Sequence, residues 1–277
     1  MVRRIVVLVD FSEYSEYQLL FAQKWAEMLN AEILLLHKMV PLYMPSMADA
    51  ETRDDMKAQA RQEIQDDLQA LREKHLSANV RVRFIITDMA LSDAVQKLHD
   101  DRHDDIIFLG LKGGGLLKKI FIGSTTIHLI DQVNSLFVTV PKHKKVEVPE
   151  HLLVSVHYRY PLYEEKFDHV LRMLKEKLKM IKFISICSDA DEKEATENYL
   201  KTLCDRFNPT LPSSYAIYPG KDAFSEIKRL AQEHQDWQLV IQRGSRAITD
   251  HFFRRFFIND LVYEASIPLL IIPSKSE

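Results

Sequence analysis

The chain has 277 residues, of which 46% are hydrophobic and 28% charged. This composition excludes a disordered chain, a collagen-like repeat and a coiled-coil rod. The 37 basic and 40 acidic residues give a net charge of −3, so no nucleic acid or anionic membrane is expected as a partner. With two cysteines and no apolar run of membrane length, we expect a reduced, cytoplasmic protein.

Buried strands alternate with helices through the first 140 residues. Runs of β-branched residues and leucines predict strands over residues 4–9, 32–37, 80–86, 105–109 and 136–140. Apolar residues at helical spacing predict helices over residues 12–29, 51–76, 90–101 and 124–133, the first with Ser12 as its N-cap. This alternation is typical of a mostly parallel sheet that is covered on both faces.

The same order of elements begins again after a polar linker at residues 142–151. Strands are expected over residues 152–156, 183–187, 214–218, 239–241 and 269–272, and helices over residues 162–179, 190–207 and 222–234. A proline, Pro141 or Pro273, ends the last strand of each series. We predict an α/β chain of two tandem doubly wound domains, 1–142 and 150–277, each with a five-stranded, mostly parallel sheet of order 3-2-1-4-5. Two unrelated α/β domains are the alternative to this duplication.

The glycines are concentrated in one loop. Only seven occur in the chain, and five of them lie between Gly110 and Gly123. The loop leaves the end of a predicted parallel strand and leads to a helix that begins at Ser124. Glycines let the backbone approach a phosphate, whose oxygens can then be bound by free N–H groups and by the helix N-terminus. Thr125 adds a hydroxyl and Lys112 a positive charge, so the loop is a candidate phosphate site, with a flexible surface loop as the alternative.

A carboxylate is expected to face the same crevice. Asp10 ends the first strand, which neighbours the fourth strand in the expected order. Because the carboxyl ends of parallel strands share one edge of the sheet, Asp10 and the glycine loop should lie close together. Its carboxylate suits a ribose hydroxyl, or a Mg²⁺ ion that bridges to phosphate.

Two motifs on this order of elements resemble the ATP-binding branch of the universal stress protein family. They are Val-Asp-Phe-Ser at residues 9–12 and G-x2-G-x9-G-[S/T] at residues 110–124. The resemblance implies a flavodoxin-like, Rossmann-like fold, ATP as the ligand with Mg²⁺ accompanying it, and dimerisation through the last strands. It implies contacts of Val9, Asp10 and Lys38 with the adenosine, and of Gly110, Gly113, Gly123, Ser124 and Thr125 with the phosphates, next to which Lys112 lies.

The second half departs from this motif. Gly110 corresponds to about Gln242 and Asp10 to about His157, and the bulky stretch RRFFIND at residues 254–260 stands where the last glycine would be. We predict that the second half binds no ATP in the same manner. Its expected role is to pair with the first half inside the chain, as a built-in dimer partner, and a homodimer of whole chains stays open.

Three classes of function remain. The first is a regulatory stress-response protein that binds ATP in its first domain. The second is a slow ATPase that uses the same site, and the third is an interaction or dimerisation module with a vestigial pocket. The intact glycine motif disfavours the third class, and the lack of an obvious base or arginine finger disfavours fast turnover. We therefore expect a binding protein without catalytic residues and with at most weak ATP hydrolysis.

Overall fold

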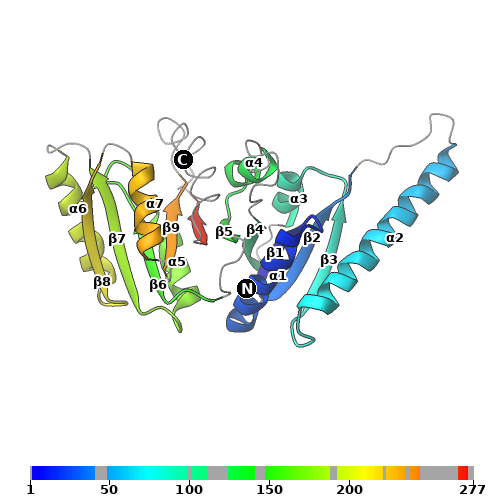
Figure 1. Cartoon of the computed structure of the whole chain (residues 1–277), viewed down its shortest axis with the longest axis horizontal. Coiled ribbons are helices and arrows are strands. Elements are labelled where there is room, and N and C mark those ends of the chain that lie inside the picture. The colour runs from blue at the N-terminus through cyan, green and yellow to red at the C-terminus, as the bar shows by residue number, and fades with distance from the viewer. Residues whose placement is uncertain are drawn as a thin grey trace. The chain divides into compact units, whose positions relative to one another are not determined.

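The computed structural model describes residues 2–40, 49–98, 102–110, 124–140, 147–187, 192–220, 223–234, 237–243 and 268–273. The chain divides into two compact units, Met1–Gly110 and Leu111–Glu277. Each unit is a layer of strands with helices packed against it, as the ribbon in Figure 1 shows.

The first unit contains a parallel sheet. Its elements are β1 (Val2–Val9), α1 (Glu13–Leu29), β2 (Glu32–Lys38), α2 (Ala50–His75), β3 (Val82–Thr87), α3 (Leu91–Leu98) and β4 (His103–Gly110). The strands lie in the order β3-β2-β1-β4, and every pair is parallel. The middle strands are apolar on both faces, which is the pattern of a sheet covered by helices on both sides.

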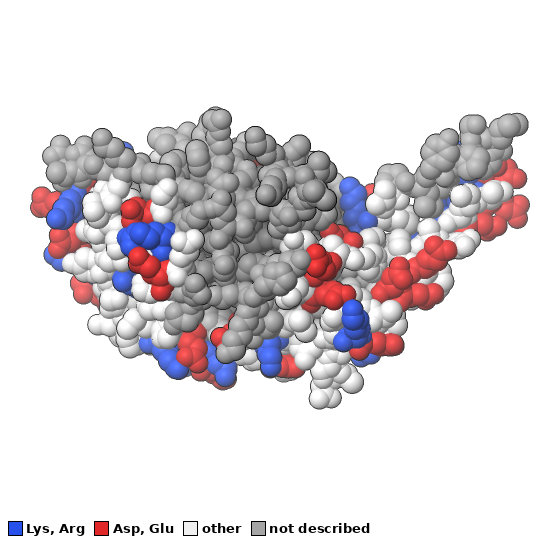
Figure 2. Space-filling view, viewed as in Figure 1, with Lys and Arg blue, Asp and Glu red and all other residues white. Residues whose placement is uncertain are grey.

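The two long helices of this unit differ in burial. α1 packs its apolar side on the sheet, and Trp25 meets Phe108 of β4 edge to face, with ring centroids 5.6 Å apart. In α2 the only buried residue is Leu68, as expected of a surface helix. Figure 1 shows α2 lying beside β3 and extending beyond it, and Figure 2 shows acidic side chains along it.

The second unit begins with the end of the first series of elements. It contains α4 (Ser124–Gln132), β5 (Leu136–Val140), β6 (His151–Ser155), α5 (Glu164–Leu174), β7 (Met180–Cys187), α6 (Lys193–Phe207), β8 (Ser213–Pro219), α7 (Ala223–Glu233), β9 (Gln238–Gln242) and β10 (Leu269–Ile272). The strand order is β5-β10-β9-β6-β7-β8, and the pairs are parallel except for β5 with β10. Phe167, Phe183 and Phe207 form an aromatic cluster in its core.

The last strands of the two series pair with each other. β10 runs antiparallel to β5, with Leu270 opposite Val138 and Leu269 opposite Thr139. The Leu269 N–H also donates to the Thr139 hydroxyl at 3.1 Å, and all four residues are buried. The expected pairing of the two halves through their last strands therefore occurs within one chain.

The predicted fold class is confirmed. The second series has the full order 3-2-1-4-5 as β8-β7-β6-β9-β10, and the first unit has the order 3-2-1-4. The predicted domain limits, 1–142 and 150–277, stay a prediction. The compact units divide earlier, after Gly110, and β5 then belongs with its partner β10 in the second unit.

Candidate functional site

The turn that follows β1 is built around Asp10. Its Oδ1 atom accepts hydrogen bonds from the backbone N–H of Ser12 at 3.1 Å, from the Ser12 hydroxyl, and from the Ser15 hydroxyl at 2.9 Å. The Asp10 N–H donates to the Ser15 Oγ at 3.0 Å. Ser12 stands at the N-cap of α1 as predicted, but its side chain caps no helix amide and turns to Asp10 instead. These bonds hold the exposed Asp10 at the carboxyl end of β1.

An aromatic pair that sequence reasoning missed lies beside this turn. Phe11 has a φ of 56°, in the left-handed region that a bulky residue rarely adopts, and it is 38% exposed. Its ring lies against that of His37, with centroids 4.7 Å apart. The Nδ1 atom of His37 is 2.9 Å from the carbonyl oxygen of Val9, and since a carbonyl only accepts, Nδ1 carries the hydrogen. Strained residues gather at functional sites, which makes this pair a candidate part of the site.

Gly110 ends β4 in a place with no room for a side chain. An added Cβ atom would lie 2.1 Å from Nε2 of Gln18, 3.0 Å from its Cδ and 3.3 Å from Cβ of Tyr14. Both neighbours belong to α1. The φ of Gly110 is not in the left-handed region, so it is the side chains of α1, and not an unusual backbone angle, that crowd this position.

The structure brings part of the predicted site together. Val9, Asp10, Lys38 and Gly110 lie at the carboxyl ends of β1, β2 and β4, which are neighbours in the sheet. Val9 is buried, while Asp10 and Lys38 are exposed. Ser124 and Thr125 begin α4 in the second unit, at the predicted helix start. Lys112, Gly113 and Gly123 lie outside the described residues, and their roles stay predictions.

A sequence model of the universal stress protein family matches residues 1–141, half of the chain. The chain belongs to the universal stress protein family. A search of curated proteins finds no match.

Solved structures are similar to this universal stress protein over almost its whole length. A universal stress protein from Archaeoglobus fulgidus has a TM-score of 0.68 at 14% identity, over 99% of this chain and 97% of that one. A putative universal stress protein from Pseudomonas aeruginosa has a TM-score of 0.56 at 14% identity, over 99% and 94%. The cytoplasmic domain of a prokaryotic cation chloride cotransporter has a TM-score of 0.51 at 12% identity, over 98% and 95%. At these identities the likeness shows the fold alone.

The second half of this universal stress protein has a hydrogen-bonded side chain at the corresponding strand end. Gln242 ends β9 as Gly110 ends β4. The amide oxygen of Gln242 accepts a hydrogen bond from the Tyr163 N–H, and its Nε2 donates to the Pro161 carbonyl at 3.1 Å. A glutamine therefore ties the β6–α5 connection to the end of β9, where the first half has only a glycine.

The rest of that connection is also held by side chains. The rings of His157 and Tyr158 stack with centroids 5.1 Å apart, and Arg159 forms an ion pair with Glu192. Burial lowers the pKa of His157 below its usual value, against the opposing effect of Glu192. The predicted counterpart of Asp10 is thus a half-buried histidine whose neutral form is favoured. The stretch at residues 254–260 lies outside the described residues.

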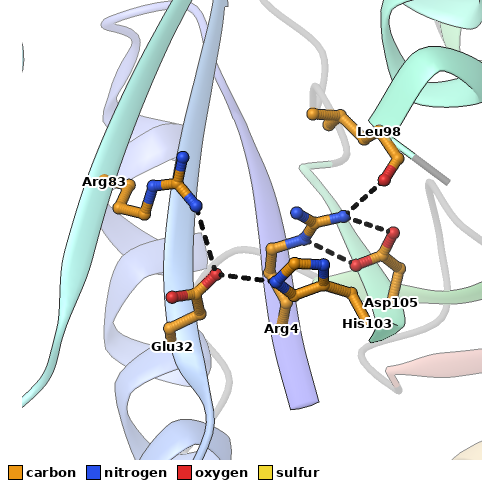
Figure 3. Close-up of polar contacts among 6 residues, drawn as sticks. All are labelled: Arg4, Glu32, Arg83, Leu98, His103 and Asp105. Atoms are coloured by element: carbon orange, nitrogen blue, oxygen red, sulfur yellow. Dashed lines mark hydrogen bonds and ion pairs between the residues drawn. The ribbon is translucent and has the colours of Figure 1, made fainter. Parts of the chain in front are cut away.

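Charged residues at the amino ends of the strands in the first unit hold these strands together. Arg4 of β1 and Asp105 of β4 are opposite each other in the strand register. Their two hydrogen bonds measure 2.7 and 2.8 Å, with side chains only 5% and 2% exposed, and Arg4 also donates to the Leu98 carbonyl. Beside them Glu32 faces His103 at 3.7 Å and an arginine of β3 (Figure 3). This cluster joins β1, β2 and β4 at their amino ends, away from Asp10.

Metal and membrane contacts find no direct support. Among the residues that the structure describes, no three His, Cys, Asp or Glu side chains gather as metal ligands. Within the same residues, no helix has the length and apolar character needed to span a bilayer. Asp10 as a ligand of nucleotide-bound Mg²⁺ stays a prediction.

Proposed function

We propose that this universal stress protein binds an adenine nucleotide, ATP, through its first half and acts as a regulatory protein in a stress response. The observation that carries the proposal is the glycine motif between the observed end of β4 at Gly110 and the observed start of α4 at Ser124. A glycine-rich connection from the carboxyl end of a parallel strand to a helix N-terminus is where α/β proteins bind phosphate. Family membership supports the same assignment.

The first-half residues fit such a ligand by their chemistry. Gly110, Lys112, Gly113, Gly123, Ser124 and Thr125 would hold the phosphates, and Val9, Asp10 and Lys38 the adenosine. Asp10 is exposed, and its hydrogen bonds to the following serines fix its position, so a ribose hydroxyl or a Mg²⁺ ion would meet a preorganised carboxylate. Lys38 is exposed at the end of β2 and would add positive charge.

The second half would bind no ATP in the same manner. Support comes from Gln242, whose amide binds the chain at Pro161 and Tyr163 in the place where the first half has Gly110. We therefore propose one nucleotide per chain, with the second half acting as a pairing partner. Isothermal titration calorimetry with Mg-ATP should give a stoichiometry near one, and two equivalent sites would contradict this assignment.

The first experiment identifies the nucleotide that copurifies with the protein. The native chain is purified, denatured and analysed by chromatography, and its thermal unfolding is then followed with and without Mg-ATP. Copurified ATP, or a rise in the melting temperature with ATP, supports the proposal. ADP alone would favour slow hydrolysis at the same site. A nucleotide-free protein that shows no thermal shift would leave an interaction module as the function.

The second experiment tests the glycine motif. Gly123→Val places a branched side chain where the motif requires bare backbone, so ATP affinity should be lost. The melting temperature of the nucleotide-free variant shows whether the fold is retained. A folded variant that binds ATP as tightly as the parent would refute the assignment of the phosphates to this loop.

A further inference from the structure

The helix that would hold the phosphates lacks a cation of its own at its C-terminus. α4 runs only from Ser124 to Gln132 and has no basic residue in its last turn. The last four carbonyl groups of a helix have no partner within it, and the aligned peptide dipoles give that end a partial negative charge. A helix this short is marginal by itself, so its order depends on contacts from elsewhere.

A residue of the second half supplies the missing cation. Arg243 directly follows β9, and its Nη1 atom lies 2.8 Å from the carbonyl oxygen of Ile130, 3.1 Å from that of Asp131 and 3.4 Å from that of Val133. Its backbone N–H donates to the carbonyl of Ile272 in β10, which fixes the arginine beside the sheet. The guanidinium thus occupies the C-terminal end of α4, where a positive charge is favourable.

We infer that Arg243 is a positioning residue for nucleotide binding, through which the second half holds α4 in place. The inference rests on the proposed function, because it concerns the helix whose first residues, Ser124 and Thr125, would meet the phosphates. Arg243 contacts this helix at the end that lies away from Ser124 and Thr125. Its effect should therefore appear in the binding of the phosphates and not in the binding of the adenosine.

This role explains what a half without the glycine motif contributes. β10 pairs with β5, and Arg243 holds α4, so the second half contacts both elements that follow the glycine motif. Removing the guanidinium leaves the carbonyls of Ile130 and Asp131 without their charged donor. The helix should then fray from its C-terminus, and the N–H groups of its first turn should lose their fixed direction.

The test compares Arg243→Ala, Arg243→Lys and the parent chain. Calorimetry measures affinities for ATP and for adenosine, and hydrogen exchange measures protection of the α4 amides without ligand. For Arg243→Ala we expect ATP affinity and α4 protection to fall roughly 5- to 30-fold, the equivalent of one charged cap, with adenosine affinity unchanged. Arg243→Lys keeps the positive charge and should recover part of both. Arg229→Ala is the matched control, because it removes ion pairs with glutamates of its own helix α7 and a cation–π contact with Tyr218 of β8.

The outcomes separate this inference from the proposed function. If Arg243→Ala leaves α4 protection unchanged, the cap is unimportant and the inference is wrong. If protection falls while ATP and adenosine affinities stay as in the parent, α4 does not position the phosphates and the inference is equally wrong. If the parent chain binds no ATP at all, the proposed function fails, and the inference about nucleotide binding fails with it. The exchange data would then still report whether Arg243 caps α4.

Discussion

Replacing Gly110 by alanine tests whether α1 or a ligand demands glycine at this position. The new Cβ atom would lie 2.1 Å from Nε2 of Gln18, far inside van der Waals contact. Gln18 is only 3% exposed, so its amide cannot move into solvent and must push against its neighbours. Gly110→Ala should therefore destabilise the folded chain even when no nucleotide is present.

The magnitude follows from two opposing effects. Overpacking of a buried site costs about 1–3 kcal/mol. Because the φ of Gly110 is not in the left-handed region, alanine has no backbone penalty and should gain roughly 0.5–1 kcal/mol from the smaller entropy of its unfolded state. The net loss in the free energy of unfolding should be about 0.5–2 kcal/mol.

A second substitution that shortens Gln18 should restore the stability lost in Gly110→Ala, because the Gln18 side chain is what the new Cβ atom would meet first. Among the residues that the structure describes, the buried Oε1 atom of Gln18 meets no hydrogen-bond partner. Gln18→Ala removes this polar group together with some packing and should be nearly neutral. In the double variant the contact with Gln18 is gone, and only the milder one with Cβ of Tyr14, at 3.3 Å, is left of the contacts described above. The cost of Gly110→Ala should then shrink by about 1–2 kcal/mol, which is the range of couplings between residues in contact.

The assay is urea denaturation of the parent, the two single variants and the double variant. Gly220→Ala is the control, because a Cβ there would first meet Cγ of Glu226, a flexible side chain, at 3.0 Å. If the two substitutions are additive within about 0.5 kcal/mol, Gln18 does not explain the glycine. The requirement at position 110 would then have to come from Tyr14 or from the ligand.

Three further changes probe the two ends of the sheets. Asp105→Ala leaves Arg4 as a buried charge without its bidentate partner and should lower the free energy of unfolding by about 3–5 kcal/mol in urea; unchanged stability would contradict the burial of this pair. Phe11→Leu removes the exposed ring beside Asp10 and should weaken adenosine binding by calorimetry roughly fivefold or more if a base stacks there. Leu20→Ala, at an equally exposed position (38%), should leave adenosine binding unchanged. Burial lowers the pKa of His157 below 6.5, so the folded chain favours the neutral form of this histidine. The resulting stabilisation is fully present above pH 6.5 and is lost as the pH falls through the folded-state pKa. His157→Gln should lessen this acid sensitivity, and an NMR titration with a pKa above 6.5 would refute it.

The strands could be predicted because the feature that produces them, a run of apolar residues, is visible in the local sequence. Runs such as Ile5–Val7 and Leu34–Leu36 are buried on both faces, and a continuous apolar stretch is what a covered parallel strand requires. The two ends of the glycine loop could also be predicted from the motif, since β4 ends at Gly110 and α4 begins at Ser124. The repeat of this order gave the fold class.

The contacts between distant residues could not be predicted in the same way. Nothing local in the sequence shows that Gln18 lies over Gly110, because the contact depends on how α1 packs on β4. Phe11 stood within the recognised motif, but its positive φ and its contact with His37 depend on the turn around Asp10. Arg243 belongs to no motif, and its role appears only when the end of β9 is seen beside the end of α4.

Gly110 and Gln242 give the ends of their strands different surroundings. Each residue ends the fourth strand of its series. Gly110 has no side chain, whereas the amide of Gln242 satisfies the N–H of Tyr163 and the carbonyl of Pro161, which a ligand or water would otherwise have to satisfy. We expect such a side chain to keep a phosphate away from this strand end. In the second half, β10 and Arg243 contact β5 and α4, the two elements that follow the glycine motif. Substitutions in β9 and β10 should therefore perturb the structure of α4 more than the structure at the carboxyl ends of β9 and β10 themselves.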